Sequence, residues 1–426
     1  MKFPINEYKK SNELYQRALK VVPGGVYGHL GPSEGCAIPI SAFPIFSSKA
    51  KGAYFWDVDG NRFVDYMCAY GPNVLGYNDP DVDAAAAAQL KKGNCVTMPG
   101  DVMVPFAELM CDTVNMADWV VFAKNGGDVT SYAVMIARQA TARKKILMIK
   151  GSYHGVAPWT QKLGHGGIIP EDVCNNLYCT FNDIEDFKRV VEANKGEIAC
   201  FITTPYSHPI FTDNELPNEN WYKEVRRICD ENGIVLIFDD IRCGFRLDVK
   251  GSDYHYGVKA DLQCFCKALA NGYNVSALCG IDSLRGYATD VYYTGSYWLS
   301  AEPFAAGIAC ISKMLNTDNW GGKQFHEYIR AKGVKLLDGL VDVAKTNGFD
   351  LVVSGEPAMW YMRLNNDYTT MLHQEWVAEC VKRGVFFVSH HNHFINAALS
   401  DEDIQFTLDV ADEAYKAVKA NHPELG

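Results

Sequence analysis

The chain has 426 residues, a length that predicts two or three domains with a substantial buried core. Hydrophobic residues make up 48% of it and charged residues 21%, an ordinary globular composition that argues against a disordered chain. The formal net charge of −11 argues against a protein that mainly binds nucleic acid or an anionic membrane. The N-terminal stretch is charged and amphipathic, and no apolar run approaches the roughly 20 residues that span a bilayer, so we expect a soluble, cytoplasmic protein.

Fourteen cysteines are scattered along the chain, and several, such as Cys200 and Cys264, lie in apolar strand-like runs. We interpret them as reduced core residues. Cys264-Phe265-Cys266 is too closely spaced for ordinary zinc ligands, and no second pair completes a site. The cluster His390-His391-Asn392-His393 lacks a carboxylate or cysteine at a recognised ligand spacing, and we expect a hydrogen-bonded loop there. We therefore predict no metal site.

Short apolar runs alternate with helical patterns in the middle of the chain. The predicted strands are 119–123, 145–149, 198–203, 234–239 and 262–266, and the predicted helices include 129–143 and 220–232. This alternation predicts an α/β fold with a mainly parallel sheet and helices on both faces. Because open α/β sheets bind ligands at the carboxyl ends of their strands, the residues that follow these runs are the first candidates for a site.

The two ends of the chain have other patterns. Residues 52–63 predict a hairpin with Asp59-Gly60 as its turn. After about residue 310, helices are followed by predicted strands at 351–354, 359–364 and 385–389 and by a final helix that Ser400 caps. We thus expect an N-terminal segment (1–70) with a small hairpin subdomain, a large domain (71–315) and a smaller C-terminal α+β domain (316–426).

Two glycine-containing turns follow the first two predicted strands. Asn125-Gly126-Gly127 leads into a helix and lets backbone N–H groups approach an anion, although an ordinary tight turn explains it as well. No triphosphate-loop pattern occurs there. Tyr153 follows the second strand beside Gly151 and Gly155, where its ring can stack on a flat ligand or lie on the surface.

Two later strands end in charged residues. Asp239 and Asp240 end the apolar run 234–239, and a carboxylate buried there needs a cationic partner, either a ligand or Arg242 or Arg246. Lys267 follows the run 262–266 directly. A desolvated lysine has a lowered pKa and forms a Schiff base with an aldehyde, whereas a lysine that reaches from the strand end to solvent is the structural alternative.

Together these residues resemble class III (ω-type) aminotransferases that depend on pyridoxal 5′-phosphate (PLP), in the branch that contains glutamate-1-semialdehyde aminomutase. The resemblance covers nearly the whole chain, and its segments occur in the family's order. They are Val22-Pro23-Gly24-Gly25, 52–65, 71–80, 124–128, 153–155, 238–246, Lys267 and 392–394. The resemblance implies the type I fold of PLP-dependent transferases and an enzyme that moves an amino group from an amine or amino acid to a keto or aldehyde acceptor.

The resemblance also implies a role for each site residue in the large domain. Lys267 holds PLP as a Schiff base and moves the proton between substrate and cofactor, Asp239 pairs with the pyridinium nitrogen, and Tyr153 stacks on the ring. The phosphate is bound by Asn125, Gly126 and Gly127. Ser296 of the neighbouring subunit adds a phosphate contact in this family, so we expect a homodimer with a shared active site. The alternative for Ser296 is an ordinary Gly/Ser turn.

The chain departs from the family in the substrate region. The aminomutase has an arginine shortly after Val-Pro-Gly-Gly-Val, and this chain does not. Because a substrate carboxylate would lack its bidentate partner, the departure argues against glutamate-1-semialdehyde as the substrate. The residues expected to form a partly aromatic pocket instead are Tyr27, His29, Tyr70 and Trp298. Further departures are Gly127 in place of Ser or Thr, and Thr204 and Asp240 each in place of Glu.

Three hypotheses therefore stand. The first is an aminotransferase that acts on small amino and keto substrates. The second is an aminomutase or racemase of the same branch, which would use the same residues. The third is a protein that has kept the fold and lost catalysis, since a fold alone does not imply a function. The presence of both Lys267 and Asp239 argues against the third.

Overall fold

The structure, a computed structural model, describes residues 3–26, 39 and 41–423. Its contacts group the chain into two units. The large unit consists of Pro80–Pro209 and Asn214–His326, and the small unit consists of Met1–Asp79, Ile210–Asp213 and Glu327–Gly426. These units are groups of contacts, and the predicted division into three domains at residues 70 and 315 stays a prediction.

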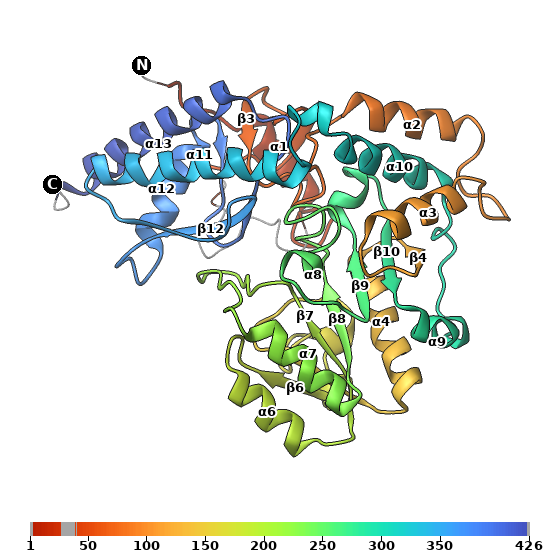
Figure 1. Ribbon diagram of the computed structural model, residues 1–426. Helices are drawn as coiled ribbons and strands as arrows, with labels where there is room; N and C mark the ends of the chain where they lie inside the picture. The colour runs from red at the N-terminus through yellow and green to blue at the C-terminus, as the bar shows by residue number, and fades with distance from the viewer. Residues whose placement is uncertain (1–2, 27–38, 40, 424–426) are drawn as a thin grey trace. The chain divides into compact units, whose positions relative to one another are not determined.

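A seven-stranded sheet forms the centre of the large unit (Figure 1). Its strands, in spatial order, are β4 (Trp119–Ala123), β10 (Ser276–Gly280), β9 (Leu262–Phe265), β8 (Val235–Asp239), β7 (Ile198–Thr203), β5 (Lys145–Ile149) and β6 (Asn176–Cys179). In this sheet β10 runs antiparallel to both of its neighbours, and the other pairs are parallel. The predicted mainly parallel sheet is confirmed.

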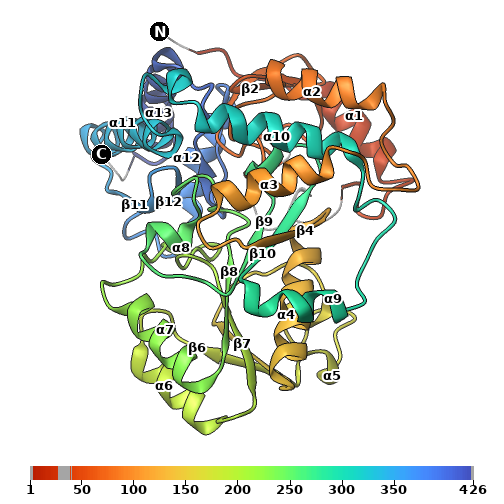
Figure 2. The same ribbon diagram turned by 45° about the vertical axis from the view of Figure 1, so that its right-hand side comes forward.

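Helices cover both faces of this sheet. In Figure 2, α4 (Gly126–Thr141) lies on one side of the strands, and α6 (Ile184–Ala193) lies beside α7 (Trp221–Asn232) on the other. The remaining helices of the unit are α2 (Pro80–Leu90), α3 (Met103–Thr113), α5 (Pro170–Val173), α8 (Ser252–His255), α9 (Arg285–Asp290), α10 (Ala301–Leu315) and the short 3-10 helices η2 (Pro158–Thr160), η3 (Lys267–Ala270), η4 (Asp282–Leu284) and η5 (Thr317–Trp320).

The alternation of side chains along the central strands explains why both faces are covered. Ile202 and Ile237 point to the core that contains α4. Their neighbours Phe201 and Phe238 point the other way, where Phe201 packs on Phe187 of α6 and Phe238 packs on Tyr222 of α7. A strand that is apolar on both faces has no solvent side, as the continuous apolar runs predict.

Two sheets and the helices α1 (Lys9–Ala18), α11 (Phe325–Thr346), α12 (Met371–Val381) and α13 (Asp401–Asn421) make up the regular structure in the described part of the small unit. The first sheet has the order β1 (Ser47–Lys51), β2 (Tyr54–Asp57), β3 (Arg62–Asp65) and β13 (Val385–Phe386), and the second has the order β11 (Leu351–Glu356), β12 (Met359–Leu364) and β14 (His393–Phe394). The predicted hairpin is β2–β3, and Ser400 caps α13 by accepting from the Asp403 N–H at 3.1 Å.

Among the described residues, no helix combines the length and the apolar character that crossing a membrane requires.

Candidate active site

Four predicted site residues of the large unit lie at one edge of its sheet. Asn125 follows β4, Tyr153 follows β5, Asp239 ends β8 and Lys267 follows β9. These four strands run in the same direction, so their carboxyl ends lie at the same edge, where α/β sheets bind ligands.

Lys267 is the first residue of η3 and is partly buried. Its backbone has a φ of +46°, in the left-handed region that residues with a side chain rarely adopt, which is typical of functional positions. Burial, and after it the positive charge of Arg242, lowers the pKa of Lys267 to about 7. Near neutral pH a large fraction of this side chain is therefore the neutral amine, the form that attacks a carbonyl.

Asp239 is 4% exposed and has two donors of its own chain. His154 Nδ1 donates to its Oδ2 at 2.7 Å, and the Ile241 N–H donates to its Oδ1 at 3.2 Å. Each carboxylate oxygen keeps a further lone pair that can accept from the N–H of a ligand. The sequence analysis included His154 only in the segment 153–155 and did not predict this contact. The need of a buried carboxylate for a cationic partner was the signal that could have found it.

The adjacent Asp240 has a different role. It accepts hydrogen bonds from the Ser252 N–H at 2.9 Å, the Ser252 hydroxyl at 2.5 Å and Gln263 Nε2 at 2.9 Å. Burial raises the pKa of this carboxyl to about 7. Asp240 thus ties the end of β8 to β9 and α8, and Asp239 is the carboxylate of the pair that is held by the Tyr153 loop.

The turn from β4 into α4 is closely packed. A Cβ added at Gly126 would lie 2.5 Å from Ile241 Cδ1, so the turn has no room for a side chain there. The Asp128 carboxylate caps the helix by accepting from the Asn125 N–H at 2.8 Å. The N–H groups of Gly126 and Gly127 belong to the first helical turn, which leaves them available to an anion.

The Tyr153 loop is fixed against this turn. A Cβ added at Gly155 would lie 2.9 Å from Gly127 Cα, and the Thr130 hydroxyl donates to the His154 carbonyl at 2.8 Å. Tyr153 itself is 55% exposed, and the guanidinium carbon of Arg242 lies 5.9 Å from its ring centroid. The loop therefore presents an aromatic ring beside the anion-binding turn.

The structure describes two of the four predicted substrate residues. Tyr27 and His29 lie outside the described residues. Tyr70 belongs to the small unit, where its ring packs edge-to-face on His391 at 5.2 Å and burial raises its pKa to about 12. Trp298 of the large unit packs against Tyr293 at 5.1 Å. A common pocket formed by these four residues stays a prediction.

Ser296 lies in the exposed loop between α9 and α10. Its carbonyl accepts from Cys95 Sγ at 3.5 Å, which joins this loop to the segment between α2 and α3. Ser296 itself is exposed on the large unit.

The histidine-rich loop of the small unit is buried and hydrogen-bonded. His391 Nδ1 donates to the Asn392 carbonyl at 2.8 Å, and the Val388 N–H donates to His393 Nε2 at 3.2 Å. No metal-binding group of three or more His, Cys, Asp or Glu side chains occurs among the described residues. The cysteines in the described part of the chain are free thiols.

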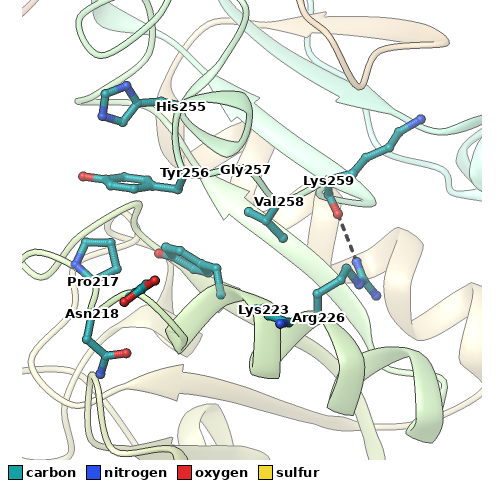
Figure 3. Close-up of a pocket in the computed structure, with 11 residues that line it drawn as sticks. Pro217, Asn218, Lys223, Arg226, His255, Tyr256, Gly257, Val258 and Lys259 are labelled. Carbon is teal, nitrogen blue, oxygen red and sulfur yellow. Dashed lines mark hydrogen bonds between the residues drawn. The ribbon is translucent and has the colours of Figure 1, made fainter.

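A pocket of about 610 Å³ lies beside α7 and α8 on another part of the large unit (Figure 3). In Figure 3 the ammonium group of Lys259 points away from it, and Arg226 donates to the Lys259 carbonyl at 3.3 Å. Arg226 also pairs with Asp230 and Asp261. None of the predicted site residues lines this pocket, so the candidate active site is the sheet edge at Lys267.

A family profile described as "Aminotransferase class-III" matches residues 38–410. The chain belongs to this family. It is 38% identical over 416 residues to the aminopentol aminotransferase of Sphingopyxis macrogoltabida, which covers 98% of this chain and 96% of that protein. It is 31% identical over 428 residues to the glutamate-1-semialdehyde 2,1-aminomutase of Francisella philomiragia subsp. philomiragia, which covers 93% of this chain and 96% of that protein.

A solved structure gives the same result. The PLP internal aldimine form of the Sphingopyxis sp. MTA144 FumI protein superimposes with a TM-score of 0.92 at 38% identity, over 98% of this chain and 99% of that one. The chain is therefore a PLP-dependent class III aminotransferase with the type I fold, acting on small amine and keto substrates. The predicted fold, family, cofactor and reaction are confirmed, while the resemblance to the aminomutase is shown only at the level of the family.

The residues at the sheet edge fit this cofactor. Asp239 is a buried carboxylate with acceptor capacity for a pyridinium N–H. Lys267 is a lysine with a lowered pKa, suited to an imine bond. The Gly126–Gly127 turn has the donors for a phosphate, and the exposed ring of Tyr153 has a face for stacking.

Proposed function

We propose that this aminotransferase carries PLP on Lys267 and uses the same amine to move a proton at the substrate carbon. When bound, PLP supplies an electron sink for the carbon that bears the amino group. The observation that supports Lys267 most directly is its place after β9, one strand from Asp239, with burial lowering its pKa to about 7. A free lysine with its ordinary pKa would remain protonated and could not accept the proton.

The other residues hold and orient the ring. Asp239 accepts the pyridinium N–H and is itself held in place by His154. Tyr153 covers one face of the ring. The phosphate is bound by Asn125, Gly126 and Gly127. His154 is a positioning residue in this assignment, because it acts through Asp239.

The assignment of Lys267 predicts a result in the purified holoenzyme. Borohydride reduction fixes an imine-bound cofactor on its lysine, and peptide mapping should then find the added mass on the peptide that contains Lys267. Lys267→Ala should lose both the added mass and the absorption band at about 420 nm that a protonated imine of PLP produces.

Lys124 offers a matched control. It is another buried lysine, burial lowers its pKa, and its ammonium donates to the Asn274 carbonyl at 3.0 Å. Lys124→Ala should keep the band. If the added mass is found on Lys124 and the band survives in Lys267→Ala, the assignment is wrong.

We infer transamination rather than an intramolecular isomerisation. The greater identity to an aminopentol aminotransferase (38%) than to an aminomutase (31%) supports this. The departure after Val-Pro-Gly-Gly-Val supports it too, since no arginine follows there. The name of the first relative, an aminopentol aminotransferase, favours an amine that carries hydroxyl groups as the donor class. Release of a keto or aldehyde product, which an aminomutase or racemase would not give, is the distinguishing observation.

We also propose a homodimer in which Ser296 contacts the phosphate bound by the partner subunit. The exposed position of Ser296 on its own large unit supports this, because an exposed residue is accessible to a partner subunit. A cytoplasmic location is part of the proposal and is supported by the free thiols of the described cysteines, which are typical of a reducing compartment.

A further inference from the structure

A second histidine lies beside the proposed cofactor lysine. His208 follows β7 and is 9% exposed. Arg242 Nη1 lies 3.1 Å from His208 Nδ1, and the positive charges of both Arg242 and Lys267 contribute to holding the pKa of His208 well below its usual range, after burial as the main cause. His208 is thus a neutral imidazole at physiological pH.

The arginine fixes the tautomer of this imidazole. A guanidinium has donors and no acceptor, so Arg242 must donate to His208 Nδ1. In a neutral imidazole that accepts at Nδ1, the proton is on Nε2. His208 Nε2 is buried and has no hydrogen-bond partner among the described residues. The pair therefore contains a buried donor that needs an acceptor, and a buried donor without one costs free energy.

The pair lies on the opposite side of Lys267 from the phosphate turn. In the order β4-β10-β9-β8-β7, the turn follows β4, Lys267 follows β9, and Arg242 and His208 follow β8 and β7. Tyr153 and His208 also line one small cavity of about 10 Å³, the space of about one water molecule. The acceptor for this pair is therefore a group other than a phosphate held at the turn after β4.

The charges near the pair favour an anion. The positive charges of Arg242 and Arg246 both contribute to lowering the pKa of Lys267, so the two arginines lie near its amine. The negative charge of Asp239 acts to raise the pKa of both Arg242 and Lys267. Its Oδ2 already accepts a hydrogen bond from His154. An anion bound beside these two arginines would interact favourably with their positive charges in a poorly hydrated place.

We propose that Arg242 and His208 form a receptor for an anionic oxygen beside Lys267, with the guanidinium and His208 Nε2–H as its donors. The inference rests on the proposed role of Lys267. Two sources have the required chemistry: the carboxylate of an amino acid or keto acid substrate, and the ring oxygen of PLP. A carboxylate here would replace the arginine that the chain lacks near its N-terminus, and would make an amino acid or keto acid one of the two substrates.

The experiment measures binding of propionate and of its neutral isostere propionamide to the PLP-loaded enzyme by isothermal titration calorimetry. Propionate should bind more tightly than propionamide. Arg242→Met and His208→Phe should each weaken propionate binding by about tenfold or more, the effect of losing a charge-assisted hydrogen bond, and leave propionamide unchanged. His208→Gln should retain most of the affinity, because its amide can both accept from Arg242 and donate.

A second readout identifies the source of the oxygen. The pH midpoint of the cofactor absorption band is measured for the same variants. The titrating or charged groups near Arg242 and His208 are Lys267, Asp239, Arg246, His154, Tyr153 and Cys266. If propionate binding is unchanged but the midpoint rises by about one pH unit in Arg242→Met, the ring oxygen of PLP is the acceptor. Loss of propionate binding assigns the substrate carboxylate.

Unchanged propionate binding together with an unchanged midpoint, in variants that keep the wild-type PLP content, would overturn the proposal. Arg242→Gln and His208→Leu, which also remove the charge and the Nε2–H donor, serve if Arg242→Met and His208→Phe do not fold. Arg227→Met, an exposed arginine of α7, is the control and should change neither readout. This outcome can be distinguished from failure of the Lys267 assignment. If that assignment fails, the wild-type enzyme carries no added mass on Lys267 after reduction.

Discussion

Asp239 and Asp240 are neighbours in sequence, but their carboxylates differ in their hydrogen-bond partners. Asp239 lies at the sheet edge with acceptor capacity left for a ligand, while the three donors to Asp240 all come from its own chain. Burial raises the pKa of Asp240 to about 7, so the folded protein keeps a proton there that the unfolded chain releases near pH 3.8. Asp240 is therefore a source of pH-dependent stability at the site.

The sign of this dependence follows from proton binding. Between about pH 4 and pH 7 the folded state binds more protons at Asp240 than the unfolded state, so stability falls as pH rises through this window. Asp240→Asn should remove up to about 1.4 kcal/mol of that fall per pH unit. The amide fits the same contacts, since its oxygen can accept from Ser252 N–H and Gln263 and its N–H₂ can donate to the Ser252 hydroxyl.

Urea unfolding at pH 5, 6 and 7 measures the effect. The decline of the unfolding free energy with pH should be shallower in Asp240→Asn than in the wild type. Asp290→Asn, at the exposed end of α9, should leave the decline unchanged. An equal decline in all three proteins would show that Asp240 loses its proton well below pH 7.

At the residue scale, the sequence predicted those residues that a local pattern marks. Lys267 and Asp239 were predicted because Lys267 follows a recognisable strand and Asp239 ends one. The partners were not predicted, because His154 lies 85 residues from Asp239 and His208 lies 34 residues from Arg242. Nothing in a local pattern tells which distant loop will reach a strand end.

At the scale of elements, the strands with long apolar runs were predicted well, and the predicted runs 234–239 and 262–266 are each one residue longer than β8 and β9. The runs 119–123, 145–149 and 198–203 are β4, β5 and β7. Helix α4 begins at Gly126 rather than at 129, because the Asp128 side chain caps it from inside the first turn. The strand Ser276–Gly280 was missed, since its small residues resemble a loop.

The turn before α4 contains two adjacent glycines, and sequence alone does not tell which of them is closely packed. Gly126→Ala would place a methyl group 2.5 Å from Ile241 Cδ1, and the Ile241 N–H is one of the donors to Asp239. We expect Ile241 to shift, with about 1 kcal/mol lost in stability and PLP bound several-fold more weakly. Titration of the apoprotein with PLP, followed by absorbance, measures the affinity.

Gly127→Ala is the matched control for this turn. A Cβ at Gly127 would lie 3.7 Å from the Val156 nitrogen and 3.8 Å from Gly155 Cα, which are ordinary contact distances. Its affinity for PLP should stay close to the wild-type value. If Gly127→Ala weakens PLP binding as much as Gly126→Ala, crowding against Ile241 is not the cause.

At the scale of the whole molecule, the two ends of the chain fold together. Val385 of β13 pairs with Val64 of β3, and the Phe394 N–H donates to the Tyr66 carbonyl at 2.7 Å. Because these contacts join residues more than 300 positions apart, the local patterns that indicated an N-terminal segment and a C-terminal domain could not predict that they share one unit.

The surface around Ser296 has apolar side chains that a partner would cover. The exposed fraction is 68% for Tyr297 and 73% for Met98, and the two segments that carry them are joined by the contact of Cys95 with the Ser296 carbonyl. Clustered exposed apolar side chains are typical of an interface between proteins. This patch agrees with the proposed homodimer, in which Ser296 reaches the site of the partner.

A shared site predicts complementation between two inactive variants. Lys267→Ala lacks the cofactor lysine, and Ser296→Asp places a negative charge against the phosphate of the other subunit. When the two proteins are unfolded, mixed and refolded together, each mixed dimer contains one site with an intact Lys267 and an intact Ser296. Random pairing makes half of the dimers mixed, so about one quarter of the wild-type activity should return. If Ser296 instead acts within its own subunit, the mixture should remain as inactive as its components, and full activity of Ser296→Asp alone would exclude any contact with the phosphate.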